Sequence, residues 1–216
     1  MDKESLIKKE LESTTGYSHY NGWDNNRCPY GYHSYTMEHI DIKGQRDTLK
    51  RVELFREHVD FKDKSVVDFG CNVGAVMHHL HEIKSGVGLD FDEKCVAAGN
   101  RISDLLGKEN IRLVHCDLDK EPMASIAQKI PQNADIALLL SIGSWVKNWK
   151  AVYELAVTRS ETFIVELNNK EEGEAQVVFL KKLGCRLHKV ADQSLDDLTG
   201  NHQRILYIGS AKSGDN

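Results

Sequence analysis

From Ser65 onward, short β-branched and apolar runs alternate with stretches that have helical periodicity. This alternation predicts parallel strands joined by helices, which pack on both faces of one sheet. The chain offers seven such strands, at 65–70, 85–91, 111–117, 134–141, 162–168, 184–191 and 203–211. Because no helical stretch separates the last two, we expect them to pair antiparallel. The pattern therefore predicts an α/β fold with a seven-stranded, mostly parallel sheet and a C-terminal antiparallel hairpin.

Helices are expected between these strands and before them. Apolar faces with helical spacing occur near 74–83, 93–106, 121–130, 145–158 and 171–183. Upstream, the sequence predicts a polar helix at about 2–12 and an amphipathic helix at about 44–59, separated by an aromatic-rich, irregular stretch at 16–40. Irregular segments of that length are often lids or binding elements. We expect a single domain overall, in which residues 1–60 form N-terminal helices and an aromatic lid segment, and residues 61–216 form the core.

The composition argues against several classes of protein. Asp and Glu outnumber Lys and Arg by 33 to 28, a net charge of -5, so no overall basic field would attract a polyanion. No apolar run reaches the roughly 18 residues that cross a bilayer, and the N-terminus is too polar for a signal peptide. We therefore expect a cytoplasmic protein that does not enter the membrane. The five cysteines contain no CxxC pair, so we expect reduced thiols and no bound metal.

The segment VVDFGCNVG at 66–74 leads from a strand through a glycine-containing turn into a helix. Gly70 and Gly74 permit positive φ and close backbone approach, so a nucleotide-like ligand can lie against the turn. A dinucleotide is disfavoured, because Asn72 replaces a glycine of the GxGxxG pattern and because Asp68 would repel a pyrophosphate. Asp68 is instead well placed to bind a cation such as an α-amino group.

Two further aspartates end the next two strands. Asp90 follows GVGL, at a position from which a carboxylate can accept hydrogen bonds from a ribose diol. Asp117 ends the third strand, where a carboxylate can accept a hydrogen bond from the exocyclic amine of adenine. An aspartate at the end of a strand, taken alone, more commonly has no role in ligand binding. Together with Asp68, they match an adenosine that carries an amino acid, which describes S-adenosylmethionine.

Over about residues 61–210, the sequence resembles the class I S-adenosylmethionine-dependent methyltransferases. The resemblance implies a Rossmann-like fold in which VVDFGCNVG lies on the methionine side of the cofactor, Asp90 binds the ribose and Asp117 meets adenine. It implies cofactor contacts at Asp68, Gly70, Cys71, Asn72, Gly74, Asp90, Phe91, Cys116, Asp117, Leu118 and Ser141. Asn72 departs from the commonest family pattern, which has glycine there. The GCN variant is familiar among methyltransferases, including some that modify RNA ends.

Three residues are candidates for a catalytic base. Ligands of open α/β sheets bind beyond the carboxyl ends of the strands, so side chains near those ends can reach the transferred methyl group. Glu166 ends an apolar strand, where partial burial would raise its pKa towards neutrality. The alternative for Glu166 is a helix-capping or hydrogen-bonded acid. His202 and His33 have suitable intrinsic pKa values, although loops also carry solvated histidines that take no part in catalysis.

Segments upstream of the core are candidates for closing over the site. YGYHSY at 30–35 and GQR at 44–46 are similar to segments of poorly characterised bacterial methyltransferases. Arg46 either clamps the cofactor carboxylate with two hydrogen bonds or is an ordinary surface arginine. Tyr32 and Tyr35 either pack on the adenine or acceptor, or they staple the segment to the domain. Trp145 either lines the pocket or packs in the core, and its helical spacing with Trp149 favours the core.

His78, His79 and His81 raise the question of a metal site. His78 and His81 share a face of the expected helix, opposite its apolar stripe, but no further ligands accompany them. We therefore expect a solvated helix face without a bound metal.

The sequence thus predicts a methyltransferase that acts on an oxygen or nitrogen atom of a small polar or glycan-like acceptor. An RNA-directed methyltransferase is the first alternative, suggested by GCNVG and by the basic stretch GQRDTLKR at 44–51. The second alternative is a regulatory subunit that binds the cofactor without catalysing a reaction. The oligomeric state stays open.

Overall fold

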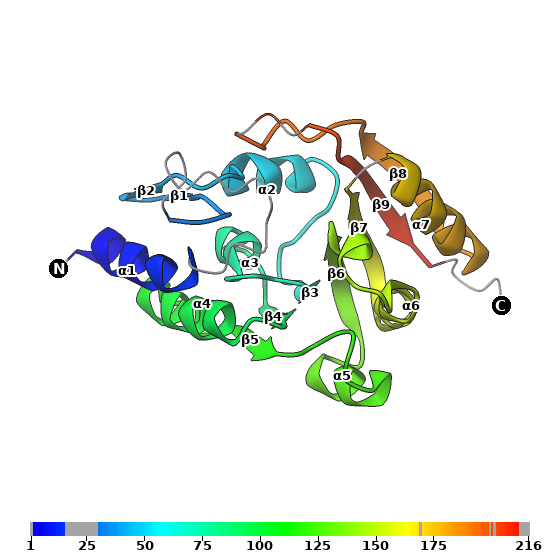
Figure 1. The fold of residues 1–216 in the computed structure, drawn as a ribbon, viewed down its shortest axis with the longest axis horizontal. Helices are drawn as coiled ribbons and strands as arrows, with labels where there is room; N and C mark the ends of the chain where they lie inside the picture. The colour runs from blue at the N-terminus through cyan, green and yellow to red at the C-terminus, as the bar shows by residue number, and fades with distance from the viewer. Residues whose placement is uncertain (1, 16–29, 169, 199, 201, 212–216) are drawn as a thin grey trace.

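Seven strands form one continuous sheet in the computed structural model of the protein (Figure 1). The structure describes residues 2–15, 30–168, 170–198, 200 and 202–211. In spatial order the strands are β5 (Ile111–His115), β4 (Ser85–Asp90), β3 (Ser65–Phe69), β6 (Ala134–Leu140), β7 (Ser160–Leu167), β9 (Ile205–Ser210) and β8 (Arg186–Ala191). The predicted α/β fold is confirmed, and all strand ends fall within two residues of their expected positions.

The order and direction of the strands position the site. The pairs β5–β4, β4–β3, β3–β6 and β6–β7 are parallel, whereas β9 lies antiparallel between β7 and β8. The predicted C-terminal hairpin is therefore confirmed. The chain reverses direction across the sheet at β3, because β4 and β5 extend to one side and β6 and β7 to the other. Ligands of open α/β sheets bind at such a point, beyond the carboxyl ends of the strands.

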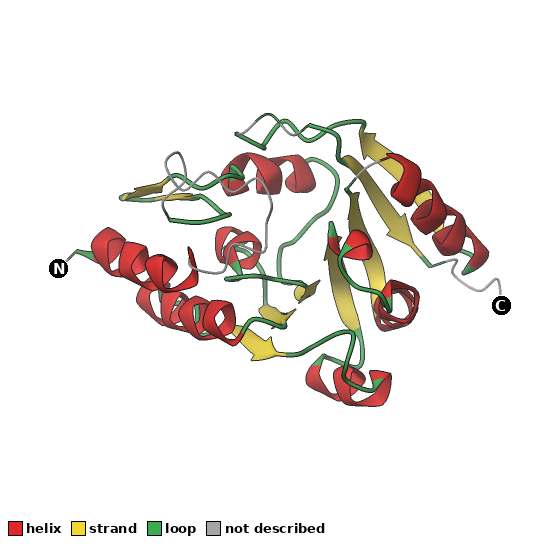
Figure 2. Ribbon diagram, in the orientation of Figure 1, coloured by secondary structure: helices red, strands yellow, loops and turns green. Residues whose placement is uncertain are grey.

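Helices cover both faces of the sheet, as Figure 2 shows. On β3, Val66 packs against the helices of one face and Val67 against those of the other, because successive side chains of a strand point in opposite directions. The helices of the first face are α2 (Thr48–Arg56), α3 (Ala75–His79) and α4 (Glu93–Leu106), and those of the second are α5 (Met123–Lys129), α6 (Trp149–Arg159) and α7 (Lys170–Lys182). Burial on both sides explains the continuous apolar runs of the central strands.

The largest differences from the sequence prediction occur at one end of three helices, α2, α3 and α6. α2 begins only after Asp47, whose side chain caps its N-terminus, so the preceding residues are not helical. α3 ends at His79 and has five residues. The helix expected from residue 145 is α6, which begins only at Trp149; residues 145–148 are not helical and follow a short 3-10 helix, η1 (Ile142–Ser144). Trp145 and Trp149 therefore do not share a helix.

The N-terminal part packs on the core through two elements. α1 (Lys3–Thr15) lies beside α4 and buries Ile7 and Leu11 (Figure 1). A hairpin of β1 (Tyr35–Met37) and β2 (Ile40–Ile42) follows, in a stretch that was expected to be irregular. Strands of three residues are too short for the alternation of apolar and polar residues to reveal them.

The remaining expectations about organisation have mixed outcomes. Residues 16–29, most of the expected aromatic lid, lie outside the described residues. The division of the chain at residue 60 into a lid segment and a core stays a prediction. None of the described helices has both the length and the apolar character that crossing a bilayer requires.

Candidate functional site

A cavity of about 660 Å³ opens at the carboxyl ends of β3, β4 and β6. Its wall also includes residues from the N-terminal part and from the loop before β9. The residues that were predicted to bind the cofactor and that line this cavity are Asp68, Gly70, Cys71, Asn72, Asp90, Phe91, Cys116, Asp117, Leu118 and Ser141. Gly74 and Arg46 do not line it. The fold thus brings most of the predicted residues around one space.

The turn after β3 has the backbone shape that its glycines predict. Gly70 has a φ of 78°, and a Cβ atom there would lie 2.6 Å from the side chain of Ile142. Gly74 has a φ of 72° and precedes α3 as its N-cap residue. The N–H groups of Gly70 and Cys71 donate to the Leu89 carbonyl at 2.8 and 3.0 Å. These bonds tie the turn to the end of β4, so a side chain at Gly70 would displace the cavity wall.

Asp68 is buried in the cavity wall, and its Oδ1 atom has no hydrogen-bond partner among the described residues. Burial raises the pKa of Asp68 to about 7, with the charge of Arg51 opposing this shift and that of Asp90 reinforcing it. A buried carboxylate without a partner is unfavourable, because it has lost its hydration without replacement. The surroundings of Asp68 therefore favour either a proton or a cation beside it.

Asp90 and Asp117 reach the same cavity from the ends of the next two strands. Asp90 accepts hydrogen bonds from the backbone N–H groups of Asn72, at 2.7 Å, and of Asp92, at 3.0 Å. Burial raises the pKa of Asp90 to about 6, although these two N–H groups lower it. Asp117 is more exposed, and its bond to Lys120 at 2.8 Å lowers its pKa. Both carboxylates can accept hydrogen bonds from hydroxyl or amine donors of a ligand.

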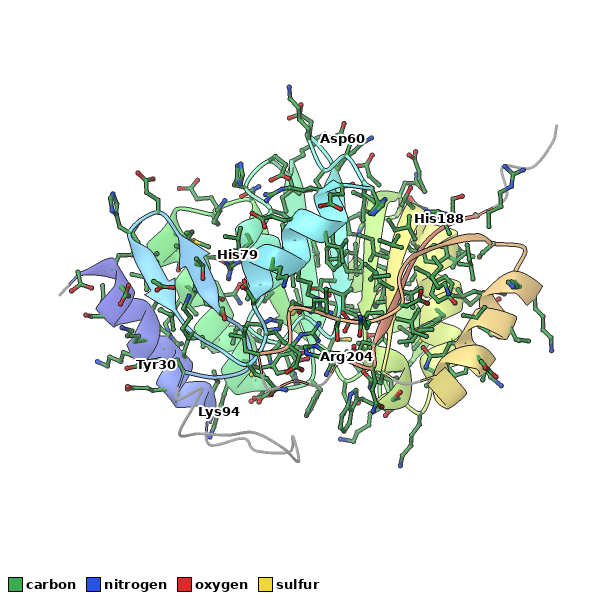
Figure 3. All side chains as sticks on the ribbon, turned by 90° about the horizontal axis from the view of Figure 1, so that it is seen from above. Tyr30, Asp60, His79, Lys94, His188 and Arg204 are labelled. Carbon is green, nitrogen blue, oxygen red and sulfur yellow. The ribbon has the colours of Figure 1, made fainter. Side chains whose placement is uncertain are left out.

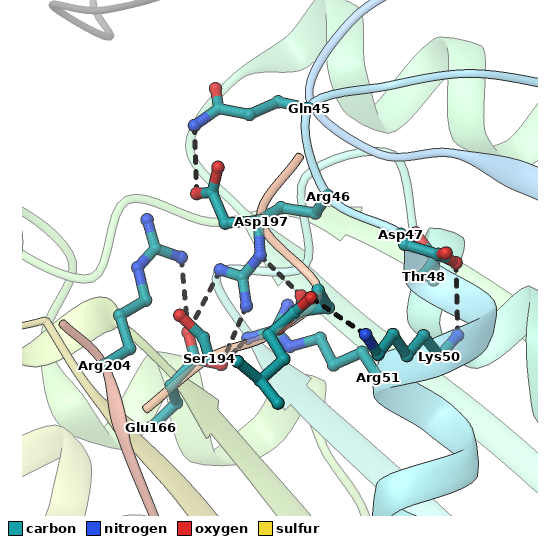
Figure 4. Close-up of polar contacts among 12 residues, drawn as sticks. Gln45, Arg46, Asp47, Thr48, Lys50, Arg51, Glu166, Ser194, Asp197 and Arg204 are labelled. Carbon is teal, nitrogen blue, oxygen red and sulfur yellow. Dashed lines mark hydrogen bonds and ion pairs between the residues drawn. The ribbon is translucent and has the colours of Figure 1, made fainter. Parts of the chain in front are cut away.

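A buried ion cluster lies at the end of β7, beside the cavity (Figure 4). Arg46 donates to both oxygens of Glu166, at 3.2 and 3.1 Å. Arg51 contacts Oε2 of Glu166 at 2.9 Å, and Arg204 contacts Oε1 at 3.3 Å. The Ser141 hydroxyl donates to the same carboxylate, and Arg46 Nε also donates to Asp196. We call this set the Glu166 cluster: Arg46, Arg51, Ser141, Glu166, Asp196 and Arg204.

The cluster reverses the pKa shift that was expected for Glu166. Burial by itself would raise this pKa, but the charges of Arg51 and Arg46 and the hydrogen bond from Ser141 lower it to about 2. The expectation of a pKa near neutrality is therefore wrong, because the strand sequence does not reveal the arginines that meet its end. A carboxylate with so low a pKa is a very weak proton acceptor. Glu166 instead anchors three guanidinium groups.

Arg46 is wholly buried, so the alternative of a surface arginine is wrong. Its Nε, Nη1 and Nη2 atoms donate to Asp196, Tyr32 and Glu166, and its side chain does not line the cavity. These bonds occupy most of the five N–H groups of the guanidinium. Arg46 is thus engaged within the protein and has little capacity left to clamp a cofactor carboxylate.

Sequence reasoning missed Arg51 and Arg204, which both line the cavity. Arg51 is buried, and its Nε has no partner in the described part of the chain. Its position was open to prediction, because Thr48, Arg51 and Phe55 have the spacing of one helix face, and all three are buried. No local pattern marks Arg204, which stands just before β9.

Of the two candidate histidines, His33 lines the cavity and His202 does not. His33 is buried, with its Nδ1 atom 3.4 Å from the Thr48 hydroxyl oxygen. Burial and the charges of Arg51 and Arg46 hold the pKa of His33 well below its usual value, so the ring is neutral at pH 7. His202 is bonded within the loop before β9. His33 is thus the histidine that the structure brings to the cavity.

Trp145 lines the cavity, and 62% of its surface is exposed, so the favoured expectation of core packing is wrong. The error follows from the helix boundary, since α6 begins four residues later. Trp149 is partly buried and packs against the core, where it contacts Tyr153 and Phe179. Tyr32 also lines the cavity, whereas Tyr35 lies outside it.

His78 is buried, so the expectation of a solvated helix face is wrong for it, whereas His81 is exposed; His79, which was not assigned to that face, is buried too. His78 bonds to the Tyr35 hydroxyl at 3.0 Å and to the Ser103 hydroxyl at 2.8 Å, and burial lowers its pKa to about 3. His79 accepts a hydrogen bond from the backbone of the β1–β2 hairpin. Tyr35 and the two histidines therefore fasten the hairpin to the core. Within the described ranges, no three potential ligands come together as a metal site.

No protein-family model matches the sequence, and neither does any curated protein. Solved structures share the fold. The N-terminal domain of EvdMO1 with SAH bound has a TM-score of 0.65 at 14% identity, with 98% of each chain covered. Against the longer EvdMO1 structure, at 15% identity and a TM-score of 0.65, the match covers 98% of this chain and 48% of that one. The chain thus spans about half the length of that relative.

Two further structures show the same likeness. The bifunctional kinase-methyltransferase WbdD has a TM-score of 0.61 at 17% identity, over 77% of this chain and 40% of that one. A putative RNA methyltransferase from Pyrococcus horikoshii has a TM-score of 0.56 at 16% identity, over 75% of this chain and 81% of that one. At these identities the likeness concerns the fold.

Proposed function

We propose that this chain, which has the class I methyltransferase fold, binds S-adenosylmethionine in the cavity and transfers its methyl group to an oxygen or nitrogen atom of a small polar or glycan-like acceptor. One observation carries the proposal: the cavity wall holds two side chains of opposite charge, each with a buried atom that has no hydrogen-bond partner among the described residues. These atoms are a carboxylate oxygen of Asp68 and a guanidinium nitrogen of Arg51. The methionine end of the cofactor carries an ammonium and a carboxylate group, which suit these two side chains.

The other carboxylates of the cavity suit the adenosine end. Asp90 can accept hydrogen bonds from the ribose hydroxyls, and Asp117, one strand further along, from the adenine amine. The volume of about 660 Å³ lies within the usual range for sites that take small molecules and cofactors. SAH is S-adenosylhomocysteine, the cofactor without its methyl group, and its presence in the N-terminal domain of EvdMO1 supports the same cofactor here.

The residues of the chain would act mainly by placing the reactants. When bound, S-adenosylmethionine supplies an electrophilic methyl carbon, whose bond to sulfur breaks as a lone pair of the acceptor attacks it. Orientation and exclusion of water then account for much of the catalysis. The Glu166 cluster fixes Arg51 and Ser141 in the cavity wall.

His33 is the candidate proton acceptor for an acceptor atom that carries a proton, because its neutral ring lines the cavity. A base with a lowered pKa assists only weakly, so we expect His33→Asn to lower kcat about tenfold while leaving SAH affinity unchanged. Steady-state kinetics and a binding titration measure both effects. An unchanged kcat would remove His33 from the mechanism.

Two observations bear on the acceptor. The N-terminal domain of EvdMO1 was also crystallised in the presence of SAH and D-fucose, which supports a sugar-like acceptor. The basic stretch at 44–51, which suggested RNA, is only partly a surface feature: Arg46 and Arg51 are buried in the Glu166 cluster, and Lys50 is exposed. Of the two sequence features that suggested an RNA substrate, GCNVG and this basic stretch, the second is thereby weakened.

Titration calorimetry with SAH tests the proposed site, because SAH lacks only the transferred methyl group. We expect saturable binding to one site per chain. Asp68→Asn should weaken this binding, whereas Asp104→Asn is the control, because Asp104 is exposed on α4 and does not line the cavity. Equal affinity in both variants would contradict the site. Saturable binding without methyl transfer to a panel of sugars and RNAs would favour the regulatory alternative.

SAH binding should also depend on pH, because burial raises the pKa of Asp68 to about 7. An ammonium group favours the ionised carboxylate, so below pH 7 binding must first displace a proton. We expect affinity to be about tenfold lower at pH 6 than at pH 8. Asp90, with a pKa of about 6, should add a factor of about two. The Asp68→Asn variant should lose the tenfold pH dependence of SAH affinity that Asp68 causes. An SAH affinity that stays constant or falls with rising pH would refute the coupling between SAH binding and the ionisation of Asp68.

A further inference from the structure

Arg204 is the second arginine of the cavity wall, and the proposed cofactor contacts do not use it. It stands just before β9, and 11% of its side chain is exposed. Figure 3 shows it near the centre of the molecule, on the loop that passes beside α2. Its Nη1 atom donates to the Tyr32 hydroxyl at 2.6 Å and to Glu166 at 3.3 Å. Its Nε atom is buried and has no partner among the described residues.

The side-on edge of the Arg204 guanidinium therefore includes an N–H group that has no acceptor among the described residues. The contacts to Tyr32 and Glu166 are made by Nη1, whereas Nε and Nη2 together form the side-on edge of the group. That edge presents two parallel N–H groups, the fork that pairs with two oxygens of a carboxylate or phosphate. An N–H group that is buried without an acceptor is unfavourable. The edge thus suits an oxyanion rather than an apolar group.

Arg51 and Arg204 differ in their relation to Asp68, the residue assigned to the methionine end of the cavity. Arg51 and Arg204 contact different oxygens of Glu166, Oε2 and Oε1 respectively. The charge of Arg51 lowers the pKa of Asp68, whereas Arg204 is not among the groups that shift it. The ammonium and carboxylate of an amino acid are attached to one carbon atom, so they require neighbouring partners, which are Asp68 and Arg51. Arg204 is therefore left to bind the methyl acceptor, the second molecule that the cavity must hold.

Tyr32 contacts both Arg204 and the candidate proton acceptor, His33. The Arg204 guanidinium lies over the Tyr32 ring, 6.0 Å from its centroid. The ring centroids of Tyr32 and His33 are 4.7 Å apart. Arg204 and His33 are therefore neighbours of the same tyrosine, and both line the cavity.

We propose that Arg204, held in place by Tyr32 and Glu166, binds the carboxylate or phosphate group of a small anionic methyl acceptor, such as a sugar acid or a sugar phosphate. The inference rests on the proposed methyltransferase function, because it divides the cavity between a cofactor and an acceptor. It narrows the acceptor class from polar molecules to anions.

Anion binding by Arg204 is tested by titration calorimetry of the SAH-saturated protein. The protein is titrated with inorganic phosphate, and separately with acetate, at constant ionic strength. We expect saturable binding of at least one anion. Binding of phosphate alone indicates a phosphorylated acceptor, and binding of acetate alone a carboxylic acid. Arg204→Gln should weaken anion binding at least about tenfold and SAH binding less than about threefold. Arg186→Gln, an exposed arginine of β8 that does not line this cavity, is the matched control and should change neither.

Saturable SAH binding with no saturable binding of either anion would overturn the inference and leave the proposed function intact. Equal losses of SAH and anion affinity in Arg204→Gln would also overturn it, because Arg204 would then serve the cofactor. Should Arg204→Gln fail to fold, Tyr32→Phe removes the hydroxyl that holds Arg204. That variant should weaken anion binding and keep SAH affinity within about threefold, and unchanged anion binding in it would refute the role of Arg204.

Discussion

Replacing Glu166 with Gln is expected to lower the free energy of unfolding by about 3–5 kcal/mol, the loss typical of breaking a buried ion pair from one side. The variant would leave three buried guanidinium groups with Asp196 as the one remaining carboxylate of the Glu166 cluster. Glu161→Gln is the matched control, since Glu161 is exposed on the same strand, β7. We expect it to change stability by less than about 0.5 kcal/mol. Urea unfolding at pH 7 measures both.

The loss in Glu166→Gln should depend on pH in a defined direction. The folded protein holds the pKa of Glu166 at about 2, below the ordinary value of 4.5. The unfolded chain therefore binds this proton more readily, and the stability that ionised Glu166 contributes is present above about pH 4.5 and is lost as the pH falls towards 2. The difference between the wild type and the variant should shrink accordingly at pH 3. A loss below about 1 kcal/mol at pH 7 would contradict the role of the cluster.

Replacing Asp90 with Ala is expected to weaken SAH binding by about 30 to 150-fold, which corresponds to about 2–3 kcal/mol. The carboxylate lines the cavity, and charge-assisted hydrogen bonds to two ribose hydroxyls would be lost with it. Asp104→Ala is the control at an exposed position of α4. Titration calorimetry compares the three proteins.

Asp90 also holds the backbone N–H of Asn72, so the thermal stability of Asp90→Ala must be measured alongside its affinity. A folded variant with wild-type SAH affinity would remove Asp90 from the site.

The sheet and the ends of its strands could be predicted because they depend on local patterns. Apolar runs separated by helical stretches specify parallel strands, and the carboxyl ends of parallel strands lie at one edge of the sheet. Asp68, Asp90 and Asp117 stand at those ends, so they had to meet at one cavity. The positive φ at Gly70 likewise follows from its place in the turn.

The Glu166 cluster could not be predicted, because its members are far apart in the sequence and meet only in the folded chain. A single acid at the end of an apolar strand does not reveal whether arginines or apolar groups will face it. The direction of its pKa shift depends on that difference. Burial alone would have raised the pKa of Glu166, and the charges of Arg51 and Arg46 reverse the sign.

The remaining errors arose at element boundaries. The burial of His78 depends on a hairpin whose three-residue strands leave no periodic signal. Trp145 was assigned to a helix that begins only at Trp149, because the apolar spacing starts in the non-helical residues 145–148 that precede the helix. Periodicity predicts which face of a helix is buried, but it does not fix where the helix starts.

The central claim is that Asp68 and Arg51 hold the amino-acid end of S-adenosylmethionine and that Asp90 holds its ribose. A crystal structure of the protein with SAH tests this most directly. The account predicts SAH in the cavity at the ends of β3 and β6, with its ammonium beside Oδ1 of Asp68 and its carboxylate beside Arg51. SAH bound elsewhere, or reversed in the cavity with adenine beside Asp68, would contradict it.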